Sequence, residues 1–207
     1  MYLFTRNRAA DLDQAPDAMA FAVDIAQHVK KVTGVEVLTW SAVYGAPIGS
    51  ISWSCRAESL AAIAKMTDQL NADADDLDKV QQSRSLFTGP LEDTIGEIVA
   101  ISGTATPGRY TNVITAQCAP GRIGEAMAWA VEAQNASSKL TGLDGLVVRS
   151  LYGPFATVAW LTPLETIEEA EAADEAFKDP EFGKTIDAAG PLFVTSNTQS
   201  RLIQRLP

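Results

Sequence analysis

The chain has a single histidine, His28, and it is the first residue to consider for proton transfer. Imidazole titrates closest to pH 7 of all unperturbed side chains, so a neutral His28 could act as a general base. The residue falls near the apolar stripe of a helix predicted over residues 17–33, at the spacing of Phe21, Ile25 and Val32. A half-buried helix residue without a catalytic role is the alternative interpretation.

Four tryptophans could give flat apolar walls to an aromatic ligand: Trp40, Trp53, Trp129 and Trp160. Each could instead be a core residue, whose buried indole N–H still needs an acceptor. We place Trp53 in the candidate catalytic set together with His28 and Asn7. The other three tryptophans are candidate ligand-binding residues.

Further polar residues could bind the same ligand and steer oxyanion charge as it develops during an oxidation. These residues are Asn112, Tyr44 and Tyr152, in addition to Asn7. Tyr44 and Tyr152 each come directly before a glycine at the end of a predicted strand. Packing of a turn explains the two tyrosines equally well.

Nothing in the sequence predicts a metal site or a bound cofactor. Cys55 and Cys118 are far apart and read as two buried apolar thiols. The acidic run at 73–78 lacks the glycine and the distal glutamate of a calcium loop, which leaves a solvated helix face. The motifs G-x-S-x-G, H-E-x-x-H and G-x-G-x-x-G do not occur.

Charge and hydropathy restrict the partners. The net charge is −10, from 16 basic and 26 acidic residues, and this disfavours nucleic acid and anionic membranes, which need clustered Lys and Arg. No stretch approaches the roughly 18 apolar residues of a membrane span. Arg6, Arg8 and Asp11 interrupt the start of the chain, so no secretion signal is predicted there. We expect a soluble, cytoplasmic protein.

One segment of the chain occurs twice. Residues 18–45 return at 126–153, an offset of 108 residues, with 11 of 28 positions identical and no gap. The repeat predicts two related halves, each of a common domain size. We expect repeat 1 over 1–102, a linker over 103–109 and repeat 2 over 110–207. His28 corresponds to Ala136, so a site built on it would exist once.

Hydrophobic periodicity predicts the same elements in both halves. In the first half, strands are expected at 2–8, 35–44, 50–56 and 93–101, and helices at 17–33 and 58–82. In the second half, strands are expected at 110–118, 143–152, 155–162 and 193–204, and helices at 121–140, 165–177 and 181–189. Each half is therefore β-α-β-β-α-β, the ferredoxin-like arrangement.

These elements define an α+β fold of two tandem ferredoxin-like repeats. The strand at 35–44 has large apolar groups on both faces, which a sheet with one wet face would not need. We expect the two antiparallel sheets to pack face to face, as an intramolecular pseudo-dimeric α/β barrel.

The chain resembles the dimeric α/β-barrel superfamily, in particular its antibiotic-biosynthesis-monooxygenase-like branch, fused in tandem. The resemblance rests on strands that contain tryptophan and lead into a helix, Ser52-Trp53-Ser54 and Ala159-Trp160-Leu161, and on Asp179-Pro180-Glu181-Phe182. Members of this branch include cofactor-free oxygenases, haem-degrading oxygenases, isomerases and proteins without known activity. The haem-degrading type uses a histidine on the second helix, and neither 59–82 nor 165–189 contains one.

Two hypotheses from different classes follow. In the first, the protein binds a small apolar, aromatic molecule between sheet and helices and oxidises it as a cofactor-free monooxygenase. In the second, it is a non-enzymatic protein-interaction or assembly module with a filled barrel. A homodimer of the tandem chain is an expected further partner. The size of the cavity between sheet and helices discriminates the two hypotheses.

Overall fold

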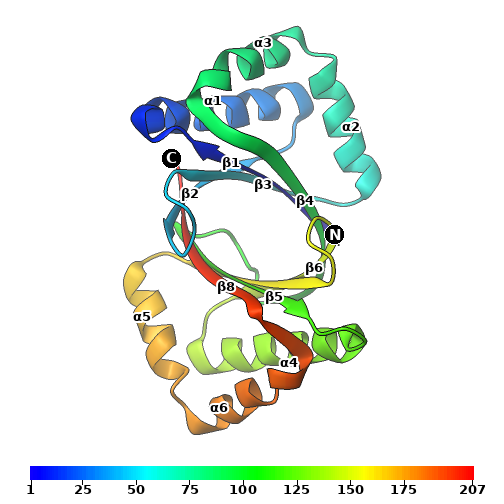
Figure 1. The fold of residues 1–207 in the computed structure, drawn as a ribbon, viewed down its shortest axis with the longest axis vertical. Coiled ribbons are helices and arrows are strands. Elements are labelled where there is room, and N and C mark those ends of the chain that lie inside the picture. Colours follow the sequence, from blue (N-terminus) through cyan, green and yellow to red (C-terminus); the bar gives the residue numbers. More distant parts are fainter. The chain divides into compact units, whose positions relative to one another are not determined.

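The computed structural model describes all 207 residues, Met1 to Pro207, and both halves of the chain show the same order of elements (Figure 1). The first half comprises β1 (Tyr2–Ala10), α1 (Ala15–Thr33), β2 (Leu38–Tyr44), β3 (Ser50–Ala57), α2 (Leu60–Asn71), α3 (Ala74–Gln82) and β4 (Phe87–Ser102). The second half comprises β5 (Tyr110–Cys118), α4 (Ile123–Thr141), β6 (Gly145–Tyr152), β7 (Thr157–Leu164), α5 (Ile167–Ala176), α6 (Pro180–Asp187) and β8 (Phe193–Arg205). Three short 3-10 turns are η1 (Leu12–Gln14), η2 (Ser83–Leu86) and η3 (Gly190–Leu192). The predicted α+β fold with two βαββαβ repeats is confirmed.

The strands are hydrogen-bonded in the order β1-β3-β2-β8-β5-β7-β6-β4, and this order closes into an antiparallel barrel. By internal contacts the chain divides into two units. Unit 1 is Met1–Ile95 with Gln204–Pro207, and unit 2 is Gly96–Ile203. The long strands β4 and β8 each contribute residues to both units, whereas every other strand belongs to one. The order in which the strands pair therefore agrees with the predicted α/β barrel.

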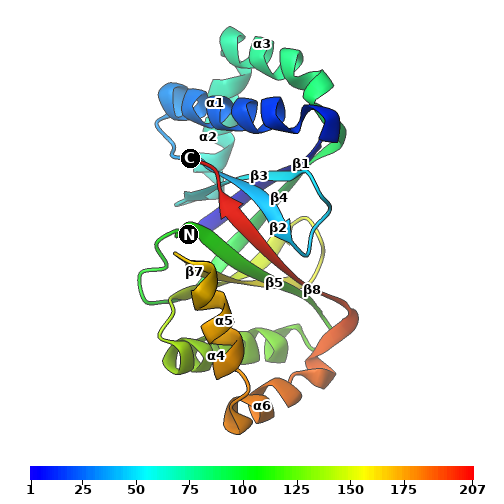
Figure 2. The ribbon, with the colours of Figure 1, turned by 90° about the vertical axis from the view of Figure 1, so that its left-hand side faces the viewer.

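In unit 1, β3 is the middle strand of an antiparallel β1-β3-β2 sheet. Arg6 lies opposite Trp53, and Asn7 and Trp40 both lie opposite Ser52. Successive side chains of a strand point to opposite faces, so Trp53 and Asn7 point to different sides of this sheet. Figures 1 and 2 show α1, α2 and α3 together on one face of the unit 1 strands.

In unit 2, β7 takes the place that β3 has in unit 1, between β5 and β6. Ile114 and Val147 both lie opposite Trp160, and Asn112 lies opposite Thr162. Helices α4, α5 and α6 cover one face of these strands (Figure 2).

The first helix of each unit ends where the sequence predicts. Gly34 and Gly142 both adopt the left-handed conformation, with φ of 74° at each, and their N–H groups bond Lys30 O and Ser138 O. Glycine enters this region without the strain that a side chain would add.

The last strand of the first half begins earlier than predicted. The sequence places its start near Asp93, but β4 begins at Phe87. The ring of Phe87 lies 6.0 Å from that of Trp53 and 5.9 Å from that of Phe21, and this buried contact fixes the strand start. Gly89-Pro90-Leu91 therefore lies within β4, whereas Gly190-Pro191-Leu192 forms η3, so the two similar segments do not have the same role.

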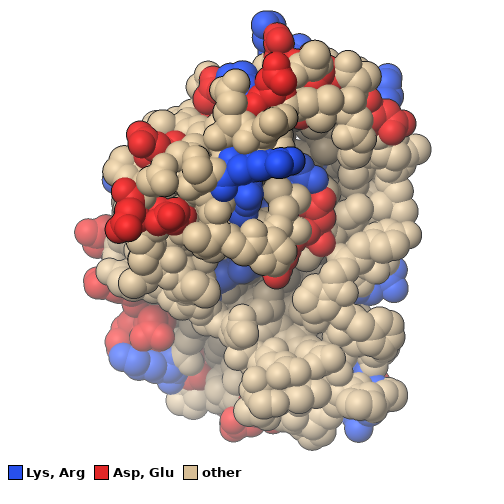
Figure 3. Space-filling view, turned by 45° about the horizontal axis from the view of Figure 1, so that its top comes forward, with Lys and Arg blue, Asp and Glu red and all other residues tan.

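The surface agrees with the acidic composition. On the face shown in Figure 3, acidic and basic side chains form separate small groups among uncharged residues, and no broad basic area is seen. None of the helices is both long and apolar enough to span a bilayer.

Two glycines of unit 2 allow a controlled test of one loop. Gly103 has a φ of 71°, and a methyl group added there would collide with the Asp144 carboxylate, whereas the same group at Gly142 would meet nothing within 4 Å. We expect Gly142→Ala to cost about 1–2 kcal/mol of stability, from the left-handed backbone alone. Gly103→Ala should cost at least about 1 kcal/mol more, because Asp144 would lose its bonds to Thr104 and Ala105. Urea unfolding measures both, and equal losses would show that the Asp144 contact contributes nothing.

Candidate functional site

A small apolar slot lies between sheet and helix in unit 1, where β3 ends and α2 begins. Its volume is about 250 Å³. The lining residues are Val35, Cys55, Arg56, Ala57, Glu58, Ser59, Ala62, Ile63 and Met66. The slot combines a mainly apolar lining with a position between sheet and helix.

Local sequence explains why α2 borders the slot. Ser59 is the N-cap of α2, and its hydroxyl oxygen accepts the N–H of Ala62 at 3.0 Å. Ile63 and Met66 follow on the inward face and are buried in one cluster with Cys55. The cap therefore fixes the first turn of the helix against the end of β3.

The inner wall of the slot is neutral. Burial raises the pKa of the Cys55 thiol, so the group stays protonated at pH 7 and is a poor nucleophile. The charged side chains, those of Arg56 and Glu58, belong to exposed residues. The slot suits an uncharged apolar group better than an ion.

The histidine lies in a separate polar cluster between α1 and α3. His28 is buried, and its Nε2 lies 3.0 Å from Oδ1 of Asp73, the N-cap of α3. The same oxygen accepts the N–H of Asp76 at 2.7 Å. The Asp76 N–H and then His28 lower the pKa of the Asp73 carboxyl. This arrangement ties α3 to α1.

Asp76 is the second carboxyl of this cluster and is only 7% exposed. Burial raises its pKa, and the charge of Asp73 acts in the same direction, while His28 and Arg6 lower it. Arg6 is itself engaged by Asp93, with two nitrogen–oxygen distances of 2.8 Å. Ionisation of Asp76 is therefore less favourable in the folded protein than in the unfolded chain.

Two of the four tryptophans occupy matching places in the two cores. Trp53 donates its indole N–H to Ala22 O at 2.9 Å, and Trp160 donates to Ala130 O at 3.0 Å. Trp129 packs edge-on against Trp160, with ring centroids 6.0 Å apart, and donates to Thr185 O. All three indole groups are thus held by backbone carbonyls and fill space between sheet and helices.

Trp40 and Asn7 lie on the other face of the unit 1 sheet. Trp40 is 5% exposed and donates its indole N–H to the Ser54 hydroxyl at 2.9 Å. Asn7 shares this face, since both lie opposite Ser52. The structure therefore places Asn7 on the sheet face of Trp40 and not on that of Trp53, and no hydrogen bond joins His28 to any of the three.

The remaining predicted residues do not converge. Tyr44 and Tyr152 end β2 and β6 and are 68% and 60% exposed. Asn112 in β5 is 3.4 Å from the Ser200 hydroxyl and touches none of the tryptophans by a hydrogen bond. The nine predicted residues are spread over both faces of the sheets and over the surface.

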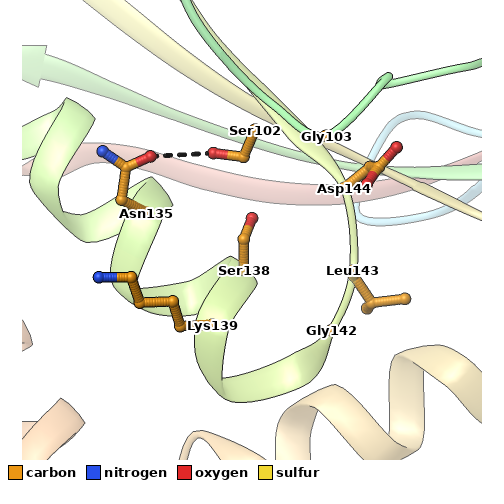
Figure 4. A pocket seen from close by; sticks show the side chains of 8 residues that line it. All are labelled: Ser102, Gly103, Asn135, Ser138, Lys139, Gly142, Leu143 and Asp144. Carbon is orange, nitrogen blue, oxygen red and sulfur yellow. Dashed lines mark hydrogen bonds between the residues drawn. The ribbon is translucent and has the colours of Figure 1, made fainter.

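Unit 2 has a larger but open polar hollow at the end of α4, with a volume of about 480 Å³ (Figure 4). The Ser102 hydroxyl donates to Oδ1 of Asn135 across the hollow at 3.1 Å, and Lys139 projects from the same helix as Asn135. Hydrogen bonds from the Thr104 hydroxyl and N–H and from the Ala105 N–H lower the pKa of Asp144. These bonds hold the loop at 103–105 in place. The Asp144 carboxylate beside the hollow therefore has a structural role. No group of three His, Cys, Asp or Glu residues is arranged to hold a metal ion.

Comparison with solved structures shows that the chain shares its fold over its whole length with several proteins of low sequence identity. A provisionally assigned monooxygenase from Fusobacterium nucleatum superposes with a TM-score of 0.72 at 12% identity, covering 100% of this chain and 92% of the other. A second, from Lactobacillus acidophilus, gives 0.68 at 11% identity, covering 99% and 93%. An anthrone oxidase-like protein gives 0.67 at 14% identity, covering 100% and 91%.

These likenesses define the class of fold and confirm the resemblance seen in the sequence. At such low identity they show the fold alone. No protein-family model matches the chain. No curated protein matches it either.

The sequence predicts three of the slot residues, Cys55, Ile63 and Met66, to be buried, but it does not predict a site there. The helical spacing of Ile63 and Met66 and the apolar context of Cys55 mark all three as inward-facing. The incomplete filling of the space between them depends on how closely α2 approaches β3, and no residue pattern encodes that distance.

The state of Asp76 gives a pH-dependent prediction. A carboxyl whose pKa is raised on folding adds stability below its unfolded pKa and loses that contribution as the pH rises through its folded value. Asp76→Asn should therefore be more stable than the parent protein at pH 7, with the gain shrinking towards pH 3. Urea unfolding from pH 3 to 8 measures this difference.

Asp75→Asn is the matched control. Asp75 also lies in the first turn of α3, but it is exposed. Both variants lose a favourable charge at the helix start, so the difference between them isolates burial. Lower stability of Asp76→Asn than of Asp75→Asn at pH 7 would mean that His28 and Arg6 outweigh the burial of Asp76.

Proposed function

We propose that the protein binds a small apolar molecule containing an aromatic ring in the slot between β3 and α2. The observation that carries this proposal is the slot itself, a mainly apolar space with a neutral inner wall, open to one side and placed between sheet and helix. Typical ligand pockets have apolar walls and a few polar groups at fixed places, here Ser59, Arg56 and Glu58.

The size of the slot sets the class of ligand. An apolar cavity of about 150 Å³ is enough to hold benzene. The slot, at about 250 Å³, therefore has room for one ring with a short substituent or for two fused rings. It is below the ~300 Å³ at which pockets for larger ligands begin.

The lining favours an aromatic ring over an aliphatic chain. Met66 and Cys55 place sulfur atoms in the walls, and thioether–aromatic contacts are favourable at a sulfur–ring distance of about 5 Å. Val35 and Ile63 supply branched apolar contacts on the remaining sides.

Oxidation is a separate step that the monooxygenase-like fold makes worth testing. For a substrate with an activated methylene group, one oxygen atom enters the substrate and the other leaves as water, so that R₂CH₂ and O₂ give R₂CO and H₂O. This chemistry needs a base and a donor to the developing oxyanion. His28, Asn7 and Trp53 are the proposed catalytic residues, and none of them lines the slot. Binding is therefore the function that we propose, and catalysis is an outcome to measure.

The second candidate function is a non-enzymatic assembly module that pairs with itself or with another protein. The observation in its favour is that aromatic rings fill the space between sheet and helices in both units. Trp53 packs with Phe87 in unit 1, and Trp160 packs with Trp129 and Phe193 in unit 2. A filled core leaves no room for a large ligand.

Two neighbouring alanines of α2 provide a matched pair for testing the slot. Both alanines are exposed, but Ala62 lines the slot and Ala61 does not. With indole as the probe, saturation-transfer NMR should detect binding to the parent protein and to Ala61→Trp. Ala62→Trp should weaken binding at least about tenfold, because the new side chain occupies the space of the ligand.

Three results would contradict the proposal: no binding of indole or phenol to the folded parent protein, equal binding by both variants, or loss of binding in both. Mass spectrometry of molecules retained from cell extract then identifies the natural ligand. Oxygen uptake with 2-indanone, which carries activated methylene groups, tests catalysis independently of binding. Self-association measured by sedimentation velocity tests the second candidate function, the assembly module.

A further inference from the structure

Two arginines of unit 1 lie close together without any acidic partner, at the end of the sheet where β1 meets η2. Arg8 is the second of the two arginines of β1 and lies on the same sheet face as Arg6, and Arg84 lies in η2. No ion pair in the structure includes either residue. This is unusual in a chain with a net charge of −10.

The contacts around the pair hold it in place. The Arg8 guanidinium lies over the ring of Phe87, 4.6 Å from its centroid, and Phe87 follows directly after η2. Asp11 N–H bonds Leu86 O at 2.9 Å, so the end of β1 is tied to η2. An arginine stacked on an aromatic face keeps its planar edge free for bidentate bonds to an oxyanion.

Neither guanidinium is satisfied by the protein. Nε of Arg8 is buried and makes no hydrogen bond, and no hydrogen bond involves the exposed Arg84. Burial first, and then the charge of Arg84, lowers the pKa of Arg8. An anion placed beside two neighbouring cations would stabilise their charged forms.

The start of α1 is tied to the same turn as Arg84. Its N-cap residue, Gln14, makes no capping bond, because its side chain donates instead to Ser85 O at 3.1 Å. The first N–H groups of this 19-residue helix are thus left without a side-chain acceptor. Asp11, Asp13 and Asp17 lie on the same stretch of chain, and none of them forms an ion pair with either arginine.

The duplication provides an internal comparison. At the repeat offset of 108 residues, Arg8 corresponds to Ala116. Phe87 and Phe193 both begin a last strand and pack on the core tryptophan, and counting back from them pairs Arg84 with Gly190. Unit 2 keeps the aromatic cluster without either arginine, so the fold of the repeat does not need the pair.

From these contacts we infer that Arg8 and Arg84 form a binding site for an oxyanion, a carboxylate or phosphate group on a small ligand. The site is separate from the apolar slot, which shares no residue with it. Arg8 supplies a preoriented guanidinium, and Arg84 supplies a second that closes on the bound group.

The test uses the full chain and inorganic phosphate, at constant ionic strength with chloride as the replaced anion. The Nε–H resonance of Arg8 should shift saturably in ¹H–¹⁵N NMR. Arg84→Gln changes an exposed residue, so it should keep the fold and weaken phosphate binding at least about tenfold, the loss of one charge-assisted contact. Acetate run in parallel distinguishes a phosphate from a carboxylate preference, and saturation by either supports the site.

Arg122→Gln is the control, because Arg122 already has a carboxylate partner in Glu125. It should bind phosphate as the parent protein does. The inference is overturned if neither phosphate nor acetate gives a saturable shift, if chloride gives the same shift, or if Arg84→Gln binds as tightly as Arg122→Gln. Near-ultraviolet circular dichroism of each variant confirms that the fold is intact.

Discussion

Close approach of one helix to the sheet is the constraint on which each unit depends. In α1, Ala18 and Ala22 have no exposed surface, and in α4 the same is true of Ala126 and Ala130. Because these side chains are small, the helix backbone comes near enough for a tryptophan of the middle strand to donate its indole N–H to a helix carbonyl, Trp53 to Ala22 and Trp160 to Ala130. A larger side chain at any of the four alanines would push the helix off the sheet and leave the indole without its acceptor.

This constraint also decides where chemistry is available. The space under α1 and α4 is filled by aromatic rings, so no ligand enters there. Space remains where the packing is looser, under the first turns of α2, and the side chains that border it are a thiol, a thioether and branched apolar groups. The polar His28–Asp73–Asp76 cluster lies between helices, away from this slot, and its contacts serve to hold α3. In unit 1, the filled core under α1, the slot under α2 and the His28–Asp73–Asp76 cluster are therefore found in separate places.

The two units have kept the same core and diverged around it. The tryptophan–carbonyl bond, the glycine that ends the first helix and the phenylalanine that begins the last strand are present in both. His28, Arg8 and Arg84 have no counterparts, since Ala136, Ala116 and Gly190 stand in their places. Features needed for folding are duplicated, whereas the features that suggest binding occur once, in unit 1.

The sequence by itself determined the repeat, the βαββαβ order, the helix ends at Gly34 and Gly142, and the inward faces of the helices, because these follow from local periodicity and backbone preference. It did not determine the start of β4, which the packing of Phe87 against Trp53 sets, nor which candidate residues converge. Asn7 and Trp53 are close in the paired strands but point to opposite faces, and only the register of β1 against β3 reveals this. The slot and the arginine pair were decided by the tertiary structure alone, because both depend on distances between segments far apart in the chain.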